Sequence, residues 1–208
     1  MTIVENKRGR GRPRAFDEEA ALKSAMRVFW AAGYDGTSMP MLTEAMGISA
    51  QSLYAAFGSK EALYRKAMDI YVRMIGGFAA RALEEEQDAI DAVIRVMRDA
   101  ATTFARTDGI PGCMITTAPA EVTETPLTRL GRDLRSASVE AVEVRLKRGI
   151  RDGQLPLDFP AAEIARYIGS IVQGMSVQAR DGATADALLS IAEVAARSLE
   201  TYRFRCLR

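Results

Sequence analysis

Apolar residues recur at helical spacing in almost every segment after residue 16, and no segment alternates convincingly with the period of a strand. Residues 17–33 illustrate the pattern, because intervals of three or four separate Leu22, Ala25, Phe29 and Gly33. Asp17 is a suitable N-cap for this helix, and Gly33 suits the position after its last turn. The periodicity predicts an all-α fold.

The same reading predicts about nine helices. After the first, we expect them near 38–46, 50–57, from 59 onward, 87–107, 113–122, 127–151, 159–180 and 184–203. The expected N-caps of the next three helices are Thr37 or Ser38, Ser49 and Ser59. The connecting segments are rich in Gly, Pro, Asp and Thr, as turns require. The chain has a natural seam around residues 72–80. We expect a flexible basic arm over 1–14, a small helical domain over 15–75 and a larger helical domain over 76–208.

The chain of 208 residues contains no histidine, which restricts its chemistry. A Ser-His-Asp or Cys-His nucleophile, a His-ligated zinc and a His general base are all impossible. No glycine-rich strand-turn-helix fingerprint suggests a nucleotide cofactor. Cys113 and Cys206 lie too far apart for metal-ligand spacing. We therefore expect a binding protein without cofactor or metal, and an all-α enzyme is the less favoured alternative.

Positive charge is concentrated near the N-terminus. Residues 1–75 hold 11 Lys/Arg against 8 Asp/Glu, whereas the remainder holds 17 against 19. Most of the excess comes from Lys7, Arg8, Arg10, Arg12 and Arg14. No apolar run approaches the ~18 residues of a membrane span, and no apolar signal segment follows the basic residues, so we expect a cytoplasmic protein without a membrane partner.

Residues 38–46 and 50–57, joined by the turn "GISA", form the outline of a helix-turn-helix. In this motif the second helix lays its N-terminal side chains against base edges in the major groove of DNA. Leu53 and Phe57 are expected to face a small core with Phe29, Leu42, Ala45 and Met46. The outer side of the second helix then carries Ala50, Gln51, Ser52, Tyr54 and Ala55.

These motifs together resemble the N-terminal domain of the TetR family of bacterial repressors. The resemblance runs from "GRPRAFDEEAALKSAM" through "SLYAAFGSKEALYRKAMD", about a quarter of the chain. Its specific elements, in order, are Gly33-Tyr34, Thr37-Ser38, Gly47-Ile48-Ser49, Leu53-Tyr54, Phe57 and Ser59-Lys60-Glu61-Ala62-Leu63. It implies an N-terminal helix-turn-helix domain of three helices followed by a helical-bundle domain for effector binding and dimerisation.

The resemblance also implies roles for single residues. Phosphate contacts fall on Thr37 or Ser38, on Tyr54 and on Lys60, whose hydroxyl, phenol and ammonium groups suit phosphate oxygens. The surface facing the bases is formed by Ser49, Ala50, Gln51, Ser52 and Ala55. Gln51 can pair bidentately with an adenine edge. Many relatives carry a basic residue at the position of Ala50, and this helix contains none.

The basic arm offers another DNA contact. Arg10-Gly11-Arg12-Pro13 matches the core of the AT-hook, an extended segment that enters narrow A·T-rich minor grooves. We expect Arg8, Arg10, Arg12 and Arg14 to contact DNA. The alternative is a solubilising tail without contacts.

For the larger domain the resemblance implies an effector pocket and a dimer interface. We expect the pocket at Phe78, Met97, Phe104, Cys113, Met114, Tyr167, Ile171 and Met175. The interface is expected on the last two helices, at Ile164, Ile168, Val172, Leu188, Ile191, Ala195 and Leu199. The alternative to either set is a plain bundle core.

The resulting hypothesis is a homodimeric repressor that binds a palindromic operator in double-stranded DNA and is released by a small molecule. A variant of this hypothesis makes Cys113 a sensor of oxidants or electrophiles, because a helix starting there would stabilise a thiolate. A third reading is an architectural DNA-binding protein without a ligand.

Overall fold

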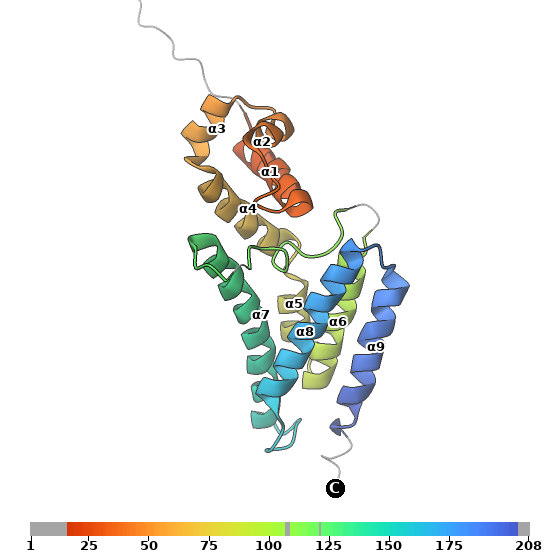
Figure 1. The fold of residues 1–208 in the computed structure, drawn as a ribbon. Helices are drawn as coiled ribbons and strands as arrows, with labels where there is room; N and C mark the ends of the chain where they lie inside the picture. The colour runs from red at the N-terminus through yellow and green to blue at the C-terminus, as the bar shows by residue number, and fades with distance from the viewer. Residues whose placement is uncertain (1–15, 107–108, 121, 204–208) are drawn as a thin grey trace, which may run out of the picture.

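The computed structural model describes residues 16–106, 109–120 and 122–203, and every regular element within them is a helix (Figure 1). The helices are α1 (Glu18–Ala32), α2 (Met39–Met46), α3 (Ala50–Phe57), α4 (Lys60–Met74), α5 (Phe78–Glu85), α6 (Ala89–Phe104), α7 (Pro126–Arg151), α8 (Ala161–Arg180) and α9 (Ala185–Glu200). The predicted all-α class is confirmed.

The first four helices begin at the capping residues predicted from the sequence. The Asp17 carboxylate accepts hydrogen bonds from the backbone N–H groups of Glu19 and Ala20. The Oγ of Ser59 accepts one from Ala62 in the same way, at 3.0 Å. Gly33 ends α1 with a φ of 72°, in the left-handed region that favours glycine. Local signals therefore fix these boundaries.

Two elements differ from the prediction. Residues 113–122 form no helix in the part that the structure describes. Instead, turns join the Thr117 N–H to the Cys113 carbonyl and the Ala118 N–H to the Ile115 carbonyl. Pro119 explains this break, since proline disfavours helical geometry at the residue before it. The helix α5 was not predicted, because its eight residues follow Gly76-Gly77 inside the expected seam.

Helices α1 to α4 pack together, and we call them the N-terminal group (Figure 1). Phe29, Leu42, Leu53 and Leu63 are at most 1% exposed at its centre, with Phe57 and Met46 beside them. Ala45 is exposed, so its predicted core position is wrong. It lies on the outer side of α2 because Leu42 and Met46 already cover the inner side.

Helices α5 to α9 form a second packed unit, the C-terminal group (Figure 1). Its centre is α6, which packs against α5, α7, α8 and α9. Ile90, Val93 and Met97 of α6 are completely buried. None of the helices in the described residues is long and apolar enough to cross a membrane.

The segment from α6 to α7 runs between the two groups (Figure 1) and is held there by close contacts. At Gly112 an added Cβ would lie 2.8 Å from both the Arg180 Cγ and the Ser176 carbonyl oxygen. The Arg180 guanidinium, at the end of α8, donates hydrogen bonds to the carbonyls of Trp30 (3.1 Å) and Ala31 (3.0 Å). Because α1 has no basic residue in its last turn, Arg180 supplies the positive charge there.

Replacing Arg180 with Gln removes this bridge between the groups. We expect the free energy of unfolding to fall by about 1 kcal/mol, since charged hydrogen bonds at a partly exposed site are removed. Urea unfolding measures this change, and hydrogen exchange is expected to quicken in residues 28–36. Arg166→Gln is the matched control on the same helix, because Arg166 forms no ion pair within the described residues. Equal stability of the two variants contradicts a bridging role for Arg180.

Candidate nucleic-acid interface and ligand cavity

One side of α3 is exposed at the end of the N-terminal group that lies away from α5 to α9 (Figure 1). Leu53 and Phe57 anchor the opposite side in the core. The exposed side carries Ala50, Gln51, Tyr54 and Ala55, with Ser49 before them. The predicted outer face of this helix is therefore accessible, and Tyr54 is 50% exposed.

The serine hydroxyls at the start of α3 are used by the helix itself. Ser49 Oγ accepts the Ser52 N–H at 3.1 Å and donates to Ser52 Oγ at 3.0 Å. Ser52 is also half-buried. Gln51 and Tyr54 are consequently the two long polar side chains that α3 presents outward.

Lys60 at the start of α4 is held over an aromatic ring. Its Nζ lies 4.2 Å from the centre of the Tyr34 ring, a favourable cation–π distance. Partial burial raises the pKa of Tyr34, and the carboxylates of Glu61 and Asp35 raise it further. The ring is therefore a neutral phenol, and its π face holds the ammonium of Lys60 by the cation–π contact.

Thr37 does not belong to the accessible face. Its side chain is buried, with the residue 2% exposed, and its Oγ1 donates a 2.6 Å hydrogen bond to the Gly33 carbonyl. The hydroxyl thus closes the turn between α1 and α2, and Thr37 is no longer a candidate for phosphate contact. Ser38 is exposed and caps α2 by accepting the Met41 N–H at 3.4 Å, so it remains one.

The N-terminal group itself carries no excess of positive charge. Residues 16–75 contain six Lys/Arg and seven Asp/Glu. The predicted arm residues Arg8, Arg10, Arg12 and Arg14 lie outside the described residues. Lys60 begins the helix that follows α3, and the Nζ of Lys66 lies 5.2 Å from the centre of the Phe57 ring of α3. The other five Lys/Arg of residues 1–75 belong to the arm.

A cavity of about 90 Å³ lies between α5, α6, α7, α8 and the segment that follows α6. Three of the predicted pocket residues line it: Phe78, Phe104 and Cys113. Met97, Met114 and Met175 are buried but pack within the core instead. The prediction is wrong for Tyr167, which is 41% exposed, and Ile171 lies half-buried beside it on the outer side of α8.

Sequence reasoning missed the contribution of α7 to the cavity. The lining from this helix comprises Arg135, Ser138, Val139 and Val142, and α8 adds Ile168, Gly169, Val172 and Gln173. The spacing of Val139 and Val142 indicates one face of a helix, but it does not tell which neighbour that face meets. Gly169 allows the two helices to approach, since an added Cβ would lie 2.6 Å from a methyl group of Val139.

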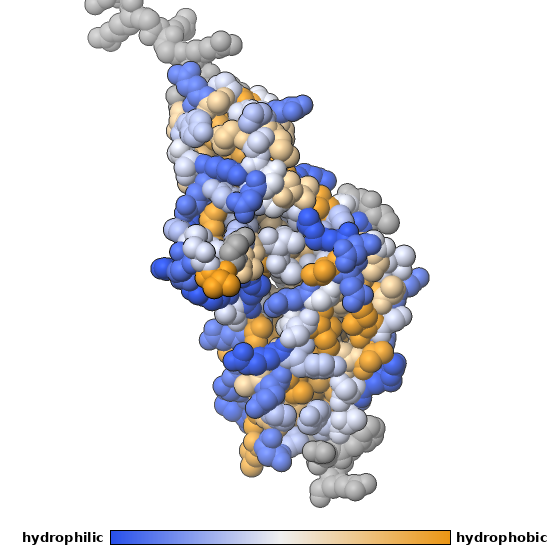
Figure 2. Space-filling view, viewed as in Figure 1, coloured by the Kyte–Doolittle hydropathy of each residue, from blue (hydrophilic) through white to orange (hydrophobic). Residues whose placement is uncertain are grey.

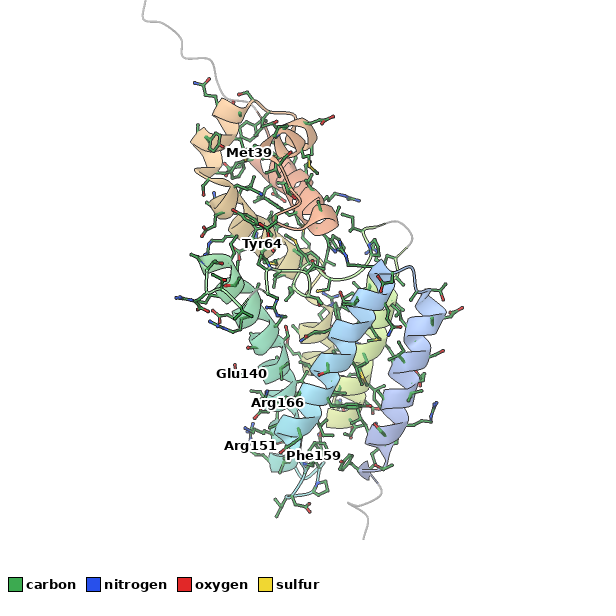
Figure 3. All side chains as sticks on the ribbon, viewed as in Figure 1. Met39, Tyr64, Glu140, Arg151, Phe159 and Arg166 are labelled. Carbon is green, nitrogen blue, oxygen red and sulfur yellow. The ribbon has the colours of Figure 1, made fainter. Side chains whose placement is uncertain are left out.

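An open groove of about 690 Å³ lies outside the cavity, between α7 and α8. Arg135, Val139, Gly169 and Gln173 line both spaces. Figure 3 labels Glu140 on α7 and Arg166 on α8, which line the groove from its two sides. The groove therefore leads from solvent to the cavity walls.

Most residues predicted for the dimer interface lie inside one chain. Ile168, Leu188, Ala195 and Leu199 are at most 1% exposed, and Val172 lines the cavity. The reason is that α9 uses its apolar side to pack on α6. Ile164 and Ile191 are half-buried. Other apolar side chains are exposed on these helices, namely Tyr167, Val177 and Val194. Figure 2 shows hydrophobic residues, in orange, among polar ones on the surface of the C-terminal group.

Cys113 is buried, and its N–H donates a 2.8 Å hydrogen bond to Ser176 Oγ. The helix expected to begin here does not form. The hypothesis of a sensor cysteine therefore loses the helix dipole that was to stabilise its thiolate. Cys206 lies outside the described residues.

Comparisons with known proteins agree with this geometry. The sequence model of "Bacterial regulatory proteins, tetR family" matches residues 21–67. The HTH-type transcriptional repressor ComR of Escherichia coli K12 is 34% identical over 89% of this chain and 90% of its own. BdcR, another HTH-type transcriptional repressor of that strain, is 27% identical over 97% and 98%.

A solved structure extends the similarity to the whole fold. It contains a cysteine variant of the TetR family transcriptional regulator CifR in complex with a 26-bp double-strand operator DNA. The two chains share 38% identity with a TM-score of 0.82, over 90% of this chain and 99% of the other.

Tyr54 and Lys60 give the first test of the DNA-facing surface. We expect Tyr54→Phe and Lys60→Ala each to weaken DNA binding about fivefold, since each removes a hydrogen bond to a charged phosphate. Lys60→Ala is also expected to lower the salt slope by ~0.9 for each phosphate that the variant no longer neutralises. Fluorescence anisotropy at several salt concentrations measures both effects.

The matched control is Lys23→Ala on α1, where Lys23 pairs with Glu19 at 2.7 Å. This variant is expected to bind DNA as the unaltered protein does. If Tyr54→Phe and Lys60→Ala also leave affinity and salt slope unchanged, the phosphate contacts are assigned to the wrong residues.

Proposed function

This chain belongs to the TetR family of bacterial regulatory proteins, and we propose that it is a dimeric repressor released from a palindromic operator by a small molecule. The observation that carries the proposal is the exposed face of α3, which presents Gln51 and Tyr54 outward, with Lys60 held over the Tyr34 ring at the start of the next helix. Gln51 reads a base edge, while Ser38, Tyr54 and Lys60 contact phosphates. The operator complex of a CifR variant supports double-stranded DNA as the partner.

The two helical groups divide the work. Residues 15–75 bind DNA, and residues 76–208 hold the effector and form the dimer. The packing of α1 to α4 apart from α5 to α9 supports this division. Ala50 and Ala55 lie near base edges without adding charge, so base reading and attraction to phosphates come from different parts of the chain.

The dimer face is assigned to the exposed sides of α8 and α9. Its residues are Tyr167, Ile171, Gly174, Val177, Ile191 and Val194, which replace the buried residues of the first prediction. Gly174 supports this assignment, since an added Cβ would point into open space, with nothing within 4 Å beyond its chain neighbours and the backbone of its own helix. Glycine within a helix costs about 1 kcal/mol relative to alanine, and a second helix packed closely on it offsets that cost.

The cavity beneath this face receives the effector. For release, the effector binds the conformation that no longer fits the operator more tightly than the one that does, because equal affinity shifts nothing. Phe78, Phe104 and Val142 give the cavity an apolar lining.

A selection of binding sites from random duplex DNA tests the function. The full chain is expected to enrich a palindrome whose half-sites lie about one helical turn apart. Val194→Arg is expected to yield monomers by light scattering and to abolish binding to this palindrome, because it places charge within the dimer face. Val144→Arg on α7 is the control, since Val144 is 56% exposed and Val194 is 59%. If no palindrome is enriched, the proposed operator recognition is wrong. If the Val194→Arg variant is still a dimer, the proposed dimer face is wrong.

The basic arm supplies most of the attraction to DNA. Deleting residues 1–14 is expected to weaken operator binding about tenfold and to flatten the salt slope by ~0.9 per phosphate that the arm neutralises. Dimerisation and effector binding should not change. Replacing Arg10 and Arg12 with Lys keeps the charge but removes the arginine geometry, so it separates minor-groove insertion from phosphate contact. A deletion variant with full affinity and an unchanged slope contradicts any DNA contact by the arm.

A further inference from the structure

Arg135 of α7 lies where the cavity, the outer groove and the segment between the two groups meet. It lines both spaces, and its Nη1 donates hydrogen bonds to the carbonyls of Ile115 (3.4 Å) and Ala118 (3.2 Å). A Cβ at Gly131, one turn earlier, would lie 3.0 Å from this Nη1. Glycine at that position leaves the guanidinium room to reach the segment.

Arg135 has no carboxylate partner within the described residues, unlike its neighbours on the same helix. Arg129 and Arg132 each form an ion pair of 3.0 Å with Glu124. Arg135 is nevertheless half-buried. A partly desolvated guanidinium with only carbonyls as partners retains donors for an anion, and a carboxylate can accept two of its hydrogen bonds side by side.

The cavity beside Arg135 limits the size of the apolar part of a ligand whose anionic group binds Arg135. Its volume of about 90 Å³ is smaller than the ~150 Å³ of an apolar cavity that takes up benzene. Phe78, Phe104 and Val142 give it apolar walls. The apolar part of a ligand that fits is therefore smaller than a benzene ring, while the groove outside gives a route of entry.

We infer that the effector is a small monoanion of the short aliphatic carboxylate class, with its carboxylate on Arg135 and its tail in the cavity. This inference rests on the proposed function, because it names the ligand of the same site. The carboxylate competes with the carbonyls of Ile115 and Ala118 for the Arg135 guanidinium. Binding thus weakens the hold of α7 on the segment between the two groups.

The segment between α6 and α7 lies next to α4, the helix that follows the DNA-binding residues of α3. Burial raises the pKa of Tyr64 on α4, and the nearby Arg135 charge opposes that rise. Arg135 is therefore close enough to α4 for its charge to act on Tyr64. A shift of Arg135 towards a ligand changes the surroundings of α4 and, through it, the position of α3.

Pentanoate and its neutral isostere pentanamide test the inference on the full chain, by calorimetry without DNA. We expect pentanoate to bind about tenfold more tightly than pentanamide, and octanoate to bind more weakly than pentanoate because its tail exceeds the cavity. Arg135→Gln is expected to reduce pentanoate affinity to that of pentanamide. Arg135→Lys keeps the charge and should retain part of the affinity, which guards against a simple loss of folding.

Two further variants complete the experiment. Arg129→Gln, on the same helix but outside cavity and groove, should bind pentanoate normally. Arg166→Gln tests the other groove cation that has no ion-pair partner in the described part of the chain, and it should also retain binding. Equal affinity for pentanoate and pentanamide, no measurable pentanoate binding, or dependence on Arg166 instead of Arg135 overturns the inference. In each of these cases operator binding by the ligand-free protein is unaffected, so the failure is distinct from failure of the proposed function.

Discussion

Two arginines hold the segment between α6 and α7 next to the N-terminal group that carries α3. Arg180 donates to the last carbonyls of α1, and its side chain packs against Gly112. Arg135 donates to carbonyls a few residues further along the same segment. Hydrogen bonds from charged donors are strong but directional, so they persist only while both helical groups keep their relative orientation. A helix-turn-helix attached through α4 alone would have more freedom.

The DNA-facing surface separates specificity from affinity. The exposed side of α3 carries an amide and a phenol but no cation, and the described part of the N-terminal group has a slight excess of acidic residues. Base contacts select a sequence, whereas phosphate contacts supply most of the salt-dependent attraction. In the proposed function, the arm and Lys60 provide the attraction that α3 lacks. Such a division lets base reading vary without altering the general affinity for DNA.

The sequence predicted those features that depend on local chemistry. Asp17, Ser49 and Ser59 cap helices because their side chains satisfy nearby N–H groups, whatever lies further away. Which sides of α8 and α9 are buried within the chain could not be predicted in this way. The spacing of Leu188, Ala195 and Leu199 is the same whether these residues pack on α6 or on a second chain. Only the tertiary packing shows that they contact α6. Thr37 was misassigned for a related reason, since its hydroxyl suits a phosphate as well as a turn.

A single helix links the proposed cavity, dimer face and bridge between the groups. Along α8, Ile168 and Val172 line the cavity, Gly174 and Val177 face outward, and Arg180 reaches α1. These positions span about three turns of one rigid helix. The cavity-lining residues therefore cannot move far unless the outward-facing residues and Arg180 move with them. A ligand that displaces the inner side of α8 therefore also strains the dimer face and the bond to α1. Because the bridge ends at the carbonyls of α1, a small movement of α8 alters the orientation of the helices that carry Gln51 and Tyr54.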